Sequence, residues 1–354
     1  MKFPPKLISL LAGASLVAAS LLNAVETDPV GYVSFTAADD SDLLVGVPLT
    51  QSPAFSASVD SVSSGQVNFT STVPDLTTEA HFLMVTTDGD PLEGQWFTVT
   101  ASDSSSVTVD EDLADLGLAS GDTVRAFPFW TLDTLFPNGG DIPQSSNVTD
   151  PEATIIMNDV TATGVNLGID TAYLYHDGSQ GPEGWYDTGN LGGGLAGDRV
   201  ISPETFFTIR NRSGSSVSIT MSGSVPVEPV ANQIVSSSST RQDNQISNPF
   251  PSSFSLGNSN LVSSGAFTAS PDVVDPEDRL LVYSTEGNSL RPSPAVVFIY
   301  HDGSQGPAGW YDLGDLGAGV QDDFEIPAGA ALIVRKAVGS DVAVAWSPQL
   351  PYSL

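Results

Sequence analysis

Apolar and polar residues alternate along much of the chain in short runs, which is the pattern of half-buried β-strands. These runs are rich in Val, Thr and aromatic residues and are bounded by Gly, Pro, Asp and Ser. The clearest of them span residues 66–71, 95–100, 106–110, 123–129, 216–221, 279–284 and 341–346. The second and third predict a β-hairpin that turns at residues 102–105, and a helical period is recognisable only over 111–119, ending by Gly121. Many short strands without intervening helices favour sandwiches or barrels, so the predicted fold class is all-β.

The first residues have the pattern of a secretory signal peptide. Lys2 and Lys6 precede the almost wholly apolar stretch 7–22, and Ala24 offers a small residue for cleavage. This stretch is shorter than the roughly 18–20 residues that a membrane-spanning helix needs. We therefore expect residues 1–24 to be removed on export. The mature chain is then expected to be extracellular, on the cell surface or in the periplasm, with no membrane span.

A segment of 22 residues occurs twice. Residues 173–194 read YLYHDGSQGPEGWYDTGNLGGG and residues 298–319 read FIYHDGSQGPAGWYDLGDLGAG, so sixteen positions are identical. Each copy continues into a run that ends in Arg, at Arg210 and Arg335. Two copies are too few for a solenoid. The prediction is two related antiparallel β-sandwich or barrel-like units, residues 25–226 and 227–354, with extra strands in the first at about 80–150.

The duplicated segment predicts a β-hairpin that carries a cluster of aromatic side chains. Two interpretations are open: the rings pack the hairpin itself, or they form a stacking surface for a sugar or a partner subunit. The candidate ligand-binding residues are Trp185, Tyr186, Trp310 and Tyr311. His176 and His301 are each followed by an Asp that points to the opposite face of a strand, so we expect structural imidazoles bonded to a backbone carbonyl.

Charge and cysteine content exclude several classes of function. The sequence has 42 acidic and 11 basic residues, a formal net charge of −31, and no Cys. Such a surface argues against binding nucleic acid or an anionic membrane, because both need cationic groups. Without Cys there is no disulfide framework, thiolate metal site or Cys nucleophile.

Acidic loops make calcium the one cofactor that the sequence suggests, although no cofactor is required by any motif. Carboxylate and carbonyl oxygens on turns are typical calcium ligands, but no twelve-residue calcium loop is present. The candidate ligands follow the two aromatic hairpins and are Asp187, Asn190, Asp198, Asp312, Asp315 and Asp322. The competing interpretation is that these are solvated loop residues.

The segment 27–32, TDPVGY, the segment 121–137 with its FPFWTL and LFP runs, and Gly184-Trp185-Tyr186 resemble an uncharacterised family. That family consists of secreted proteins found as many paralogues in verrucomicrobial and related bacteria. The resemblance covers most of the chain after the leader and implies export and a β-rich fold. It implies no reaction and no catalytic residues.

These observations favour a secreted, non-enzymatic surface or matrix protein with a structural or adhesive role, as a subunit of an extracellular assembly. Its expected partners are itself, other cell-surface proteins or glycans. One alternative is a carbohydrate-binding module that uses the four aromatic residues named above. A less favoured alternative is a secreted glycoside hydrolase with two carboxylates in a groove.

Overall fold

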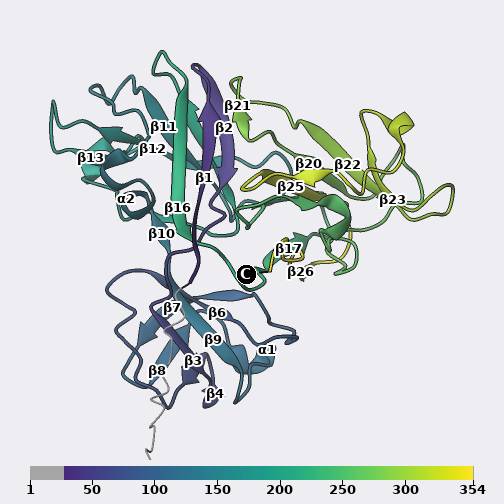
Figure 1. Ribbon diagram of the computed structural model, residues 1–354, viewed down its shortest axis with the longest axis horizontal. Helices are drawn as coiled ribbons and strands as arrows, with labels where there is room; N and C mark the ends of the chain where they lie inside the picture. The colour runs from purple at the N-terminus through teal and green to yellow at the C-terminus, as the bar shows by residue number, and fades with distance from the viewer. Residues whose placement is uncertain (1–27, 354) are drawn as a thin grey trace, which may run out of the picture.

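The computed structural model describes residues 28–353, so the signal peptide predicted over residues 1–24 lies outside the described part. Almost all regular structure is β, arranged in several antiparallel sheets, which confirms the predicted all-β class. Figure 1 shows a first unit, a second unit beside it and an inserted lobe that extends away from both. Among residues 28–353 no helix is both long and apolar enough to cross a bilayer.

The first unit is built from the two parts of residues 28–226 that precede and follow the inserted lobe. Its five-stranded sheet has the order β13-β12-β11-β15-β2, and β1 pairs with β16 in a second layer. Its elements are β1 (Val30–Ala37), β2 (Ser41–Gly46), β10 (Trp130–Thr131), α2 (Leu132–Leu135), η1 (Pro137–Gly139), β11 (Ala153–Asn158), β12 (Ile169–His176), β13 (Gly184–Asp187), η2 (Leu191–Gly193), β14 (Val200–Ile201), β15 (Phe206–Asn211) and β16 (Val217–Ser224).

The second unit repeats this topology in a shorter stretch of chain. Its five-stranded sheet has the order β23-β22-β20-β25-β18, and β17 pairs with β26, so each of these seven strands has a counterpart in the first unit. Its elements are β17 (Asn232–Ser236), β18 (Gln242–Ser247), β19 (Phe254–Ser255), η3 (Leu256–Asn258), β20 (Arg279–Val282), β21 (Glu286–Gly287), β22 (Val296–His301), β23 (Gly309–Asp312), η4 (Leu316–Ala318), β24 (Glu325–Ile326), β25 (Ala331–Lys336) and β26 (Val342–Trp346).

The inserted lobe occupies the chain between β2 and β10 and corrects the predicted position of the extra strands. They lie within residues 55–128 rather than about 80–150. Segments 55–58 and 61–63 are short, Ser-rich and alternate weakly, and the predicted run 66–71 forms a strand of this lobe rather than of the first unit's own sheets. They form one curled seven-stranded sheet, β3-β9-β6-β7-β8-β5-β4, around its own apolar core. Its elements are β3 (Phe55–Ser58), β4 (Ser61–Ser63), β5 (Gln66–Asn68), β6 (His81–Val85), β7 (Trp96–Ser102), β8 (Ser106–Val109), α1 (Leu113–Leu116) and β9 (Thr123–Pro128).

Two local predictions fall within this lobe. The hairpin predicted over 95–110 is formed by β7 and β8, and the Asp103 carboxylate fixes its turn by accepting the N–H groups of Ser105 and Ser106 at 2.7 and 2.9 Å. The predicted helical segment forms only the single turn α1. It ends at Gly117, whose φ of 109° is the left-handed conformation that glycine tolerates, earlier than the predicted stop.

One Asp–Arg ion pair is repeated in both units and holds the outer strand of each sheet. Arg210 Nε lies 2.7 Å from Asp42 Oδ1 between β15 and β2, and Arg335 Nε lies 2.7 Å from Asp243 Oδ1 between β25 and β18. Both carboxylates are buried and both pairs have a second hydrogen bond, so the contact is bidentate. Because the two ion pairs are equivalent, they show which residues of β2 and β18 correspond, with Asp42 matching Asp243.

That alignment shows that the two units meet through equivalent residues. Gly46 and Ser247 occupy the same position in β2 and β18, and a Cβ on Gly46 would fall 2.1 Å from Ser247 Oγ. Gly46 N donates to Gly329 O at 2.9 Å, and in the reciprocal bond Ser247 N donates to Glu204 O at 3.2 Å. Reciprocal contacts between equivalent residues are the mark of a local two-fold axis.

One guanidinium of the inserted lobe contacts both units. Arg125 on β9 makes a bidentate ion pair with Asp28, at 2.7 and 2.8 Å, and approaches Glu228 at 3.4 Å. Asp28 lies shortly before β1 and Glu228 shortly before β17, the first strands of the two units. A single arginine therefore joins the start of each unit to the lobe.

Candidate functional site

The two 22-residue copies form the same hairpin. β12 and β13 place Tyr175 opposite Trp185, and β22 and β23 place Tyr300 opposite Trp310. In both pairs the ring centroids are 5.3 Å apart and the rings meet edge to face. The predicted aromatic cluster is therefore present in each unit.

The tryptophans, however, lie inside the protein rather than on its surface, which contradicts their use as a stacking platform. Trp185 is 0% exposed and Trp310 is 2% exposed. Each packs against a phenylalanine of its own core, Phe136 at 6.2 Å and Phe267 at 4.8 Å between ring centroids. Burial of so large an apolar ring is favourable, and it leaves no indole face for a sugar.

The tyrosines and histidines of the hairpins mainly stabilise their own turns. Tyr186 and Tyr311 are half-buried, and each hydroxyl donates to the carbonyl oxygen of the proline four residues earlier, at 2.8 and 2.9 Å. His176 and His301 are buried, and Nδ1 of each accepts the N–H of the glycine two residues further on, at 3.1 Å. The imidazoles thus bond to a backbone amide rather than to the predicted carbonyl, because the tight turn directs that N–H inward.

Three of the predicted calcium ligands already accept hydrogen bonds from nearby backbone N–H groups, and the six residues do not converge on one site. Asp187 Oδ1 accepts from Gly189 N, Asp312 Oδ1 accepts from Gly314 N, both at 2.7 Å, and Asp322 Oδ1 accepts from Trp310 N at 2.9 Å. Asn190 and Asp315 precede the short turns η2 and η4. Asp198 is exposed.

Asp198 is also not the counterpart of Asp322. Ala196 N donates to Trp185 O, and Gln321 N donates to Trp310 O, so Asp322 corresponds to Gly197 and the prediction paired residues one place out of register. In residues 28–353 no three acidic or histidine side chains converge on one point. Calcium binding stays a prediction that rests on the acidic loops alone.

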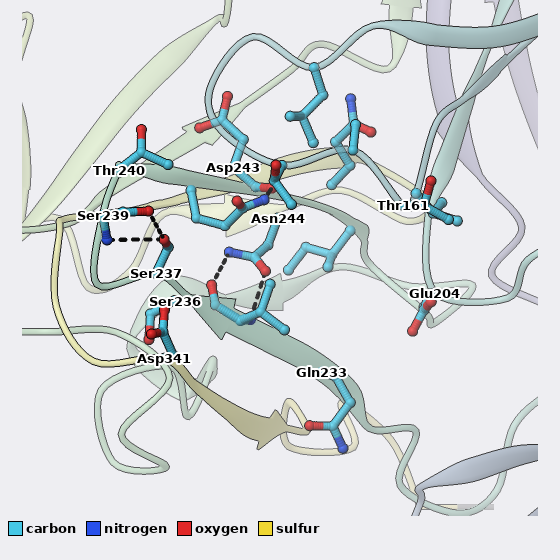
Figure 2. A pocket seen from close by; sticks show the side chains of 18 residues that line it. Thr161, Glu204, Gln233, Ser236, Ser237, Ser239, Thr240, Asp243, Asn244 and Asp341 are labelled. Atoms are coloured by element: carbon cyan, nitrogen blue, oxygen red, sulfur yellow. Dashed lines mark hydrogen bonds between the residues drawn. The ribbon is translucent and has the colours of Figure 1, made fainter. Parts of the chain in front are cut away.

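A cavity lies where the two units meet, and sequence reasoning did not find it. This polar slot has a volume of about 560 Å³. The loop 160–167 after β11 and Glu204 of the first unit line one side, and β17, β18 and Asp341 of the second unit line the other. Figure 2 shows Asn244 between β17 and the loop, with Thr161 and Glu204 on the first-unit side.

The slot is lined by groups that form hydrogen bonds, and most of its acids are already engaged. Asp243 is held by Arg335, and Asp341 accepts both the N–H and the hydroxyl of Ser238 at 2.7 and 2.6 Å. Burial alone raises the pKa of Glu204 to about 7. Gln245 Oε1 is buried and finds no partner among the described residues. The lining suits a polar ligand with its own donors.

Asn244 places a side-chain amide along the backbone of β17. Its Oδ1 accepts the N–H of Val235 at 2.7 Å, and its Nδ2 donates to the carbonyl oxygen of Val235 at 3.0 Å (Figure 2). An amide that bonds to both groups of one residue copies the pairing of a neighbouring strand. In the described residues β17 has a strand on one side only, β26.

No protein-family model and no curated protein sequence matches this chain. Among solved structures, a weak likeness is found to one described as the structure of the Macrobrachium rosenbergii nodavirus. It is 8% identical, has a TM-score of 0.11, and covers 97% of this chain and 95% of that chain. A score this low does not establish a common fold, so the function is argued from the geometry of this protein.

Proposed function

We propose that this protein is an exported, non-catalytic component of the cell surface or extracellular matrix, with a structural or adhesive role. The observation that supports this most directly is the polar slot between the two units. Its lining of amides, hydroxyls and one uncommitted carboxylate is suited to holding another molecule by hydrogen bonds. The strongly acidic composition, with a net charge of −31, supports a protein that works in a salt-rich exterior.

The arrangement of acids favours binding over hydrolysis. A glycoside hydrolase needs two carboxyl groups free to act on either side of one bond. In the slot, Asp243 and Asp341 are held by Arg335 and Ser238, which leaves Glu204. We therefore propose that bound molecules leave the slot unchanged, and that neither calcium nor another cofactor is needed to hold them.

Partners of this protein are proposed to be further copies of itself, other surface proteins or glycans. Glycan binding stays a second candidate because hydroxyl-rich ligands also suit amide and carboxylate linings. Its site would be the slot rather than the buried Trp185 and Trp310. Membership of the secreted verrucomicrobial-type family is likewise part of the proposal, with the export that it implies.

The direct test uses residues 25–354 as a purified protein. Analytical ultracentrifugation over a range of protein concentrations, a glycan array and a whole-cell adhesion assay report on the three classes of partner. We expect at least one to show saturable binding without turnover of a panel of polysaccharides. A protein that stays monomeric and inert in all three assays, or that cleaves a polysaccharide, would contradict the proposal.

A further inference from the structure

The slot is the place where the local two-fold symmetry of the molecule fails. In each unit the loop after the central strand crosses to the Asp of the other unit's ion pair. Ser289 O accepts from Asp42 N at 3.0 Å, and Arg291 N donates to Asp42 Oδ2 at 2.9 Å. At the reciprocal place, Gly164 O accepts from Asp243 N and Asn166 N donates to Asp243 Oδ2, both at 2.8 Å. The two loops are therefore anchored identically.

Only one of the two loops then becomes a strand. In the second unit's loop, Glu286 and Gly287 form β21, which runs parallel to β1 of the first unit and pairs with Thr36 and Ala37. Ala38 N donates to Gly287 O at 2.7 Å and completes that edge. The matching residues of the first unit's loop, Thr161 and Ala162, line the polar slot instead.

The matching edge in the second unit is that of β17. Val33 of β1 lies opposite Met221, and Asn232 of β17 lies opposite Trp346, at the same position of the repeat. Val235 and Ser236 therefore stand where Thr36 and Ala37 receive β21. The slot is a place for a strand that this chain does not fill over residues 28–353.

Two residue differences hold the slot open. A Cβ on Gly287 would lie 3.0 Å from Leu43 Cβ, so β21 reaches β1 only because it carries glycine there. In the first unit's loop, Ala162 stands in place of that glycine. In the second unit, Asn244 stands in place of Leu43, and its side-chain amide bonds to the N–H and the carbonyl oxygen of Val235. The loop cannot close on β17 as its counterpart closes on β1.

We propose that the polar slot accepts an extended segment of another polypeptide, which adds to β17 as a parallel strand and displaces the Asn244 amide. This deepens the proposed adhesive function and rests on it. Strand addition of this kind gives affinity through main-chain hydrogen bonds and specificity through side-chain pockets. The edge of a two-stranded sheet is open to such pairing.

The slot and its occupied counterpart define the chemistry of the segment. It carries a small residue, best glycine, at the position of Gly287, since the space between the strands is narrow there. Its side chains are uncharged or basic, because Glu204 and Asp341 line the slot and Arg335 is committed to Asp243. The β21 segment, residues 283–290, supplies the backbone pattern, with Glu286 as the one acidic residue to replace.

The probe is therefore the peptide YSTKGNSL, labelled with a fluorophore and measured by fluorescence anisotropy against residues 25–354. We expect saturable binding that is weaker for YSTEGNSL and lost for YSTKPNSL, in which proline removes the central N–H and the small residue. In the variant Asn244→Leu, which carries the first unit's residue, affinity should rise about 5- to 30-fold, because two competing hydrogen bonds are gone.

A second variant tests the location. Val235→Pro removes the N–H that faces the slot and should abolish binding, whereas Val338→Pro, on an exposed loop outside the slot, should leave it unchanged. Failure of the peptide to bind Asn244→Leu at millimolar concentration overturns the inference. So does equal binding to wild type and Val235→Pro with circular dichroism unchanged, or blockage of the slot by a glycan that the peptide does not compete with.

The two levels of the proposal can fail separately. A protein that self-associates or adheres to cells but does not bind the peptide retains its proposed function and loses the strand-addition site. A protein that binds the peptide through Val235 but shows no adhesion retains the site and loses the adhesive function.

Discussion

The two units solve the same structural problem with different residues at one buried position. In the first unit Ala153 lies opposite Asn211, whose amide donates to three backbone carbonyls at 2.8–3.1 Å. In the second unit the matching residues are Asp278 and Lys336, a buried ion pair that also bonds to Thr268 and the carbonyl of Ala266. The polar group is kept in both, but its partners come from different segments. The repeat therefore conserves the satisfaction of buried polar atoms rather than residue identity.

The largest effect should come from breaking the ion pair on one side only. Lys336→Met leaves the Asp278 carboxylate buried without its counter-charge, so we expect a loss of about 3–5 kcal/mol in the free energy of unfolding. Urea denaturation followed by circular dichroism measures it.

The double variant Asp278→Asn/Lys336→Met removes both charges. The amides of Thr268 and Ala337 donate to different oxygens of Asp278, so the single amide oxygen of Asn keeps an acceptor for one of the two. The double variant should be closer to wild type than Lys336→Met alone, because the first unit carries a neutral pair at this place. A double variant that is less stable than the single one would show that the two units do not tolerate the same solutions.

The next effect concerns Gly329 and its counterpart Glu204. Gly329 has a φ of 61°, and a Cβ there would lie 2.9 Å from Phe35 Cζ and 3.1 Å from Gly46 O. Gly329→Ala should cost about 2–4 kcal/mol from backbone strain and overpacking. Glu204→Ala, at the matching position beside the slot, should cost at most about 1 kcal/mol. Thermal unfolding of the two variants side by side measures the difference, and equal losses would mean that the junction is packed alike on both sides.

The repeated ion pairs should respond alike to neutralisation. Asp42→Asn and Asp243→Asn should each cost about 1.5–3 kcal/mol at neutral pH. Burial raises the pKa of Asp42, but the hydrogen bond and charge of Arg210 and the N–H of Arg291 outweigh it and hold the pKa below its usual value. The stabilisation is therefore present above the unfolded-state pKa of about 4 and is lost as pH falls through the lower native value. Unfolding midpoints of wild type and Asp42→Asn should converge in acid, and a gap that stays constant to pH 2 would refute the linkage.

The smallest effect belongs to the slot itself. Because the folded-state pKa of Glu204 is raised to about 7, the group favours the folded state below its usual pKa of 4.5 and loses that advantage as pH rises through 7. Glu204→Gln should therefore gain about 1 kcal/mol over wild type at pH 8 and little at pH 4. Urea midpoints at the two pH values decide it. A gain that is equal at both values would show that the carboxylate does not titrate in this range.

Much of the fold could be predicted because identical residues form identical hairpins. The 22-residue repeat, the run ending in Arg210 or Arg335 and the turn at Asp103 all follow from local patterns that survive packing. The burial of Trp185 and Trp310 did not follow, since a hairpin pattern does not tell which face meets a core. The inserted lobe was misplaced because Ser-rich β3 and β4 are stabilised by their neighbours rather than by their own alternation.

The polar slot could not be predicted from either half alone. It depends on a difference between halves, Gly287 against Ala162 and Leu43 against Asn244, at positions outside the conserved repeat. An alignment anchored on the 22-residue repeat pairs Ala162 with Gly287, and one anchored on Asp42 and Asp243 pairs Leu43 with Asn244. However, β2 and β18 share little beyond the aspartate that would anchor the second alignment. The slot is indicated by residues that differ between the two units, and these differences can be recognised only once the two-fold relation of the units is known.

The donated strand β21 makes the dependence between the units unequal, because the loop contacts to Asp42 and Asp243 are reciprocal but only β1 receives a strand from the other unit. A protease that cut the linker between β16 and β17 would not release two finished domains. The first would lose the strand that covers Thr36 and Ala37, while the second would keep every strand of its own sheets. Loss of the second half should therefore expose the edge of β1 and leave the first half prone to pair with other chains. Loss of the first half removes no strand from the edge of β17.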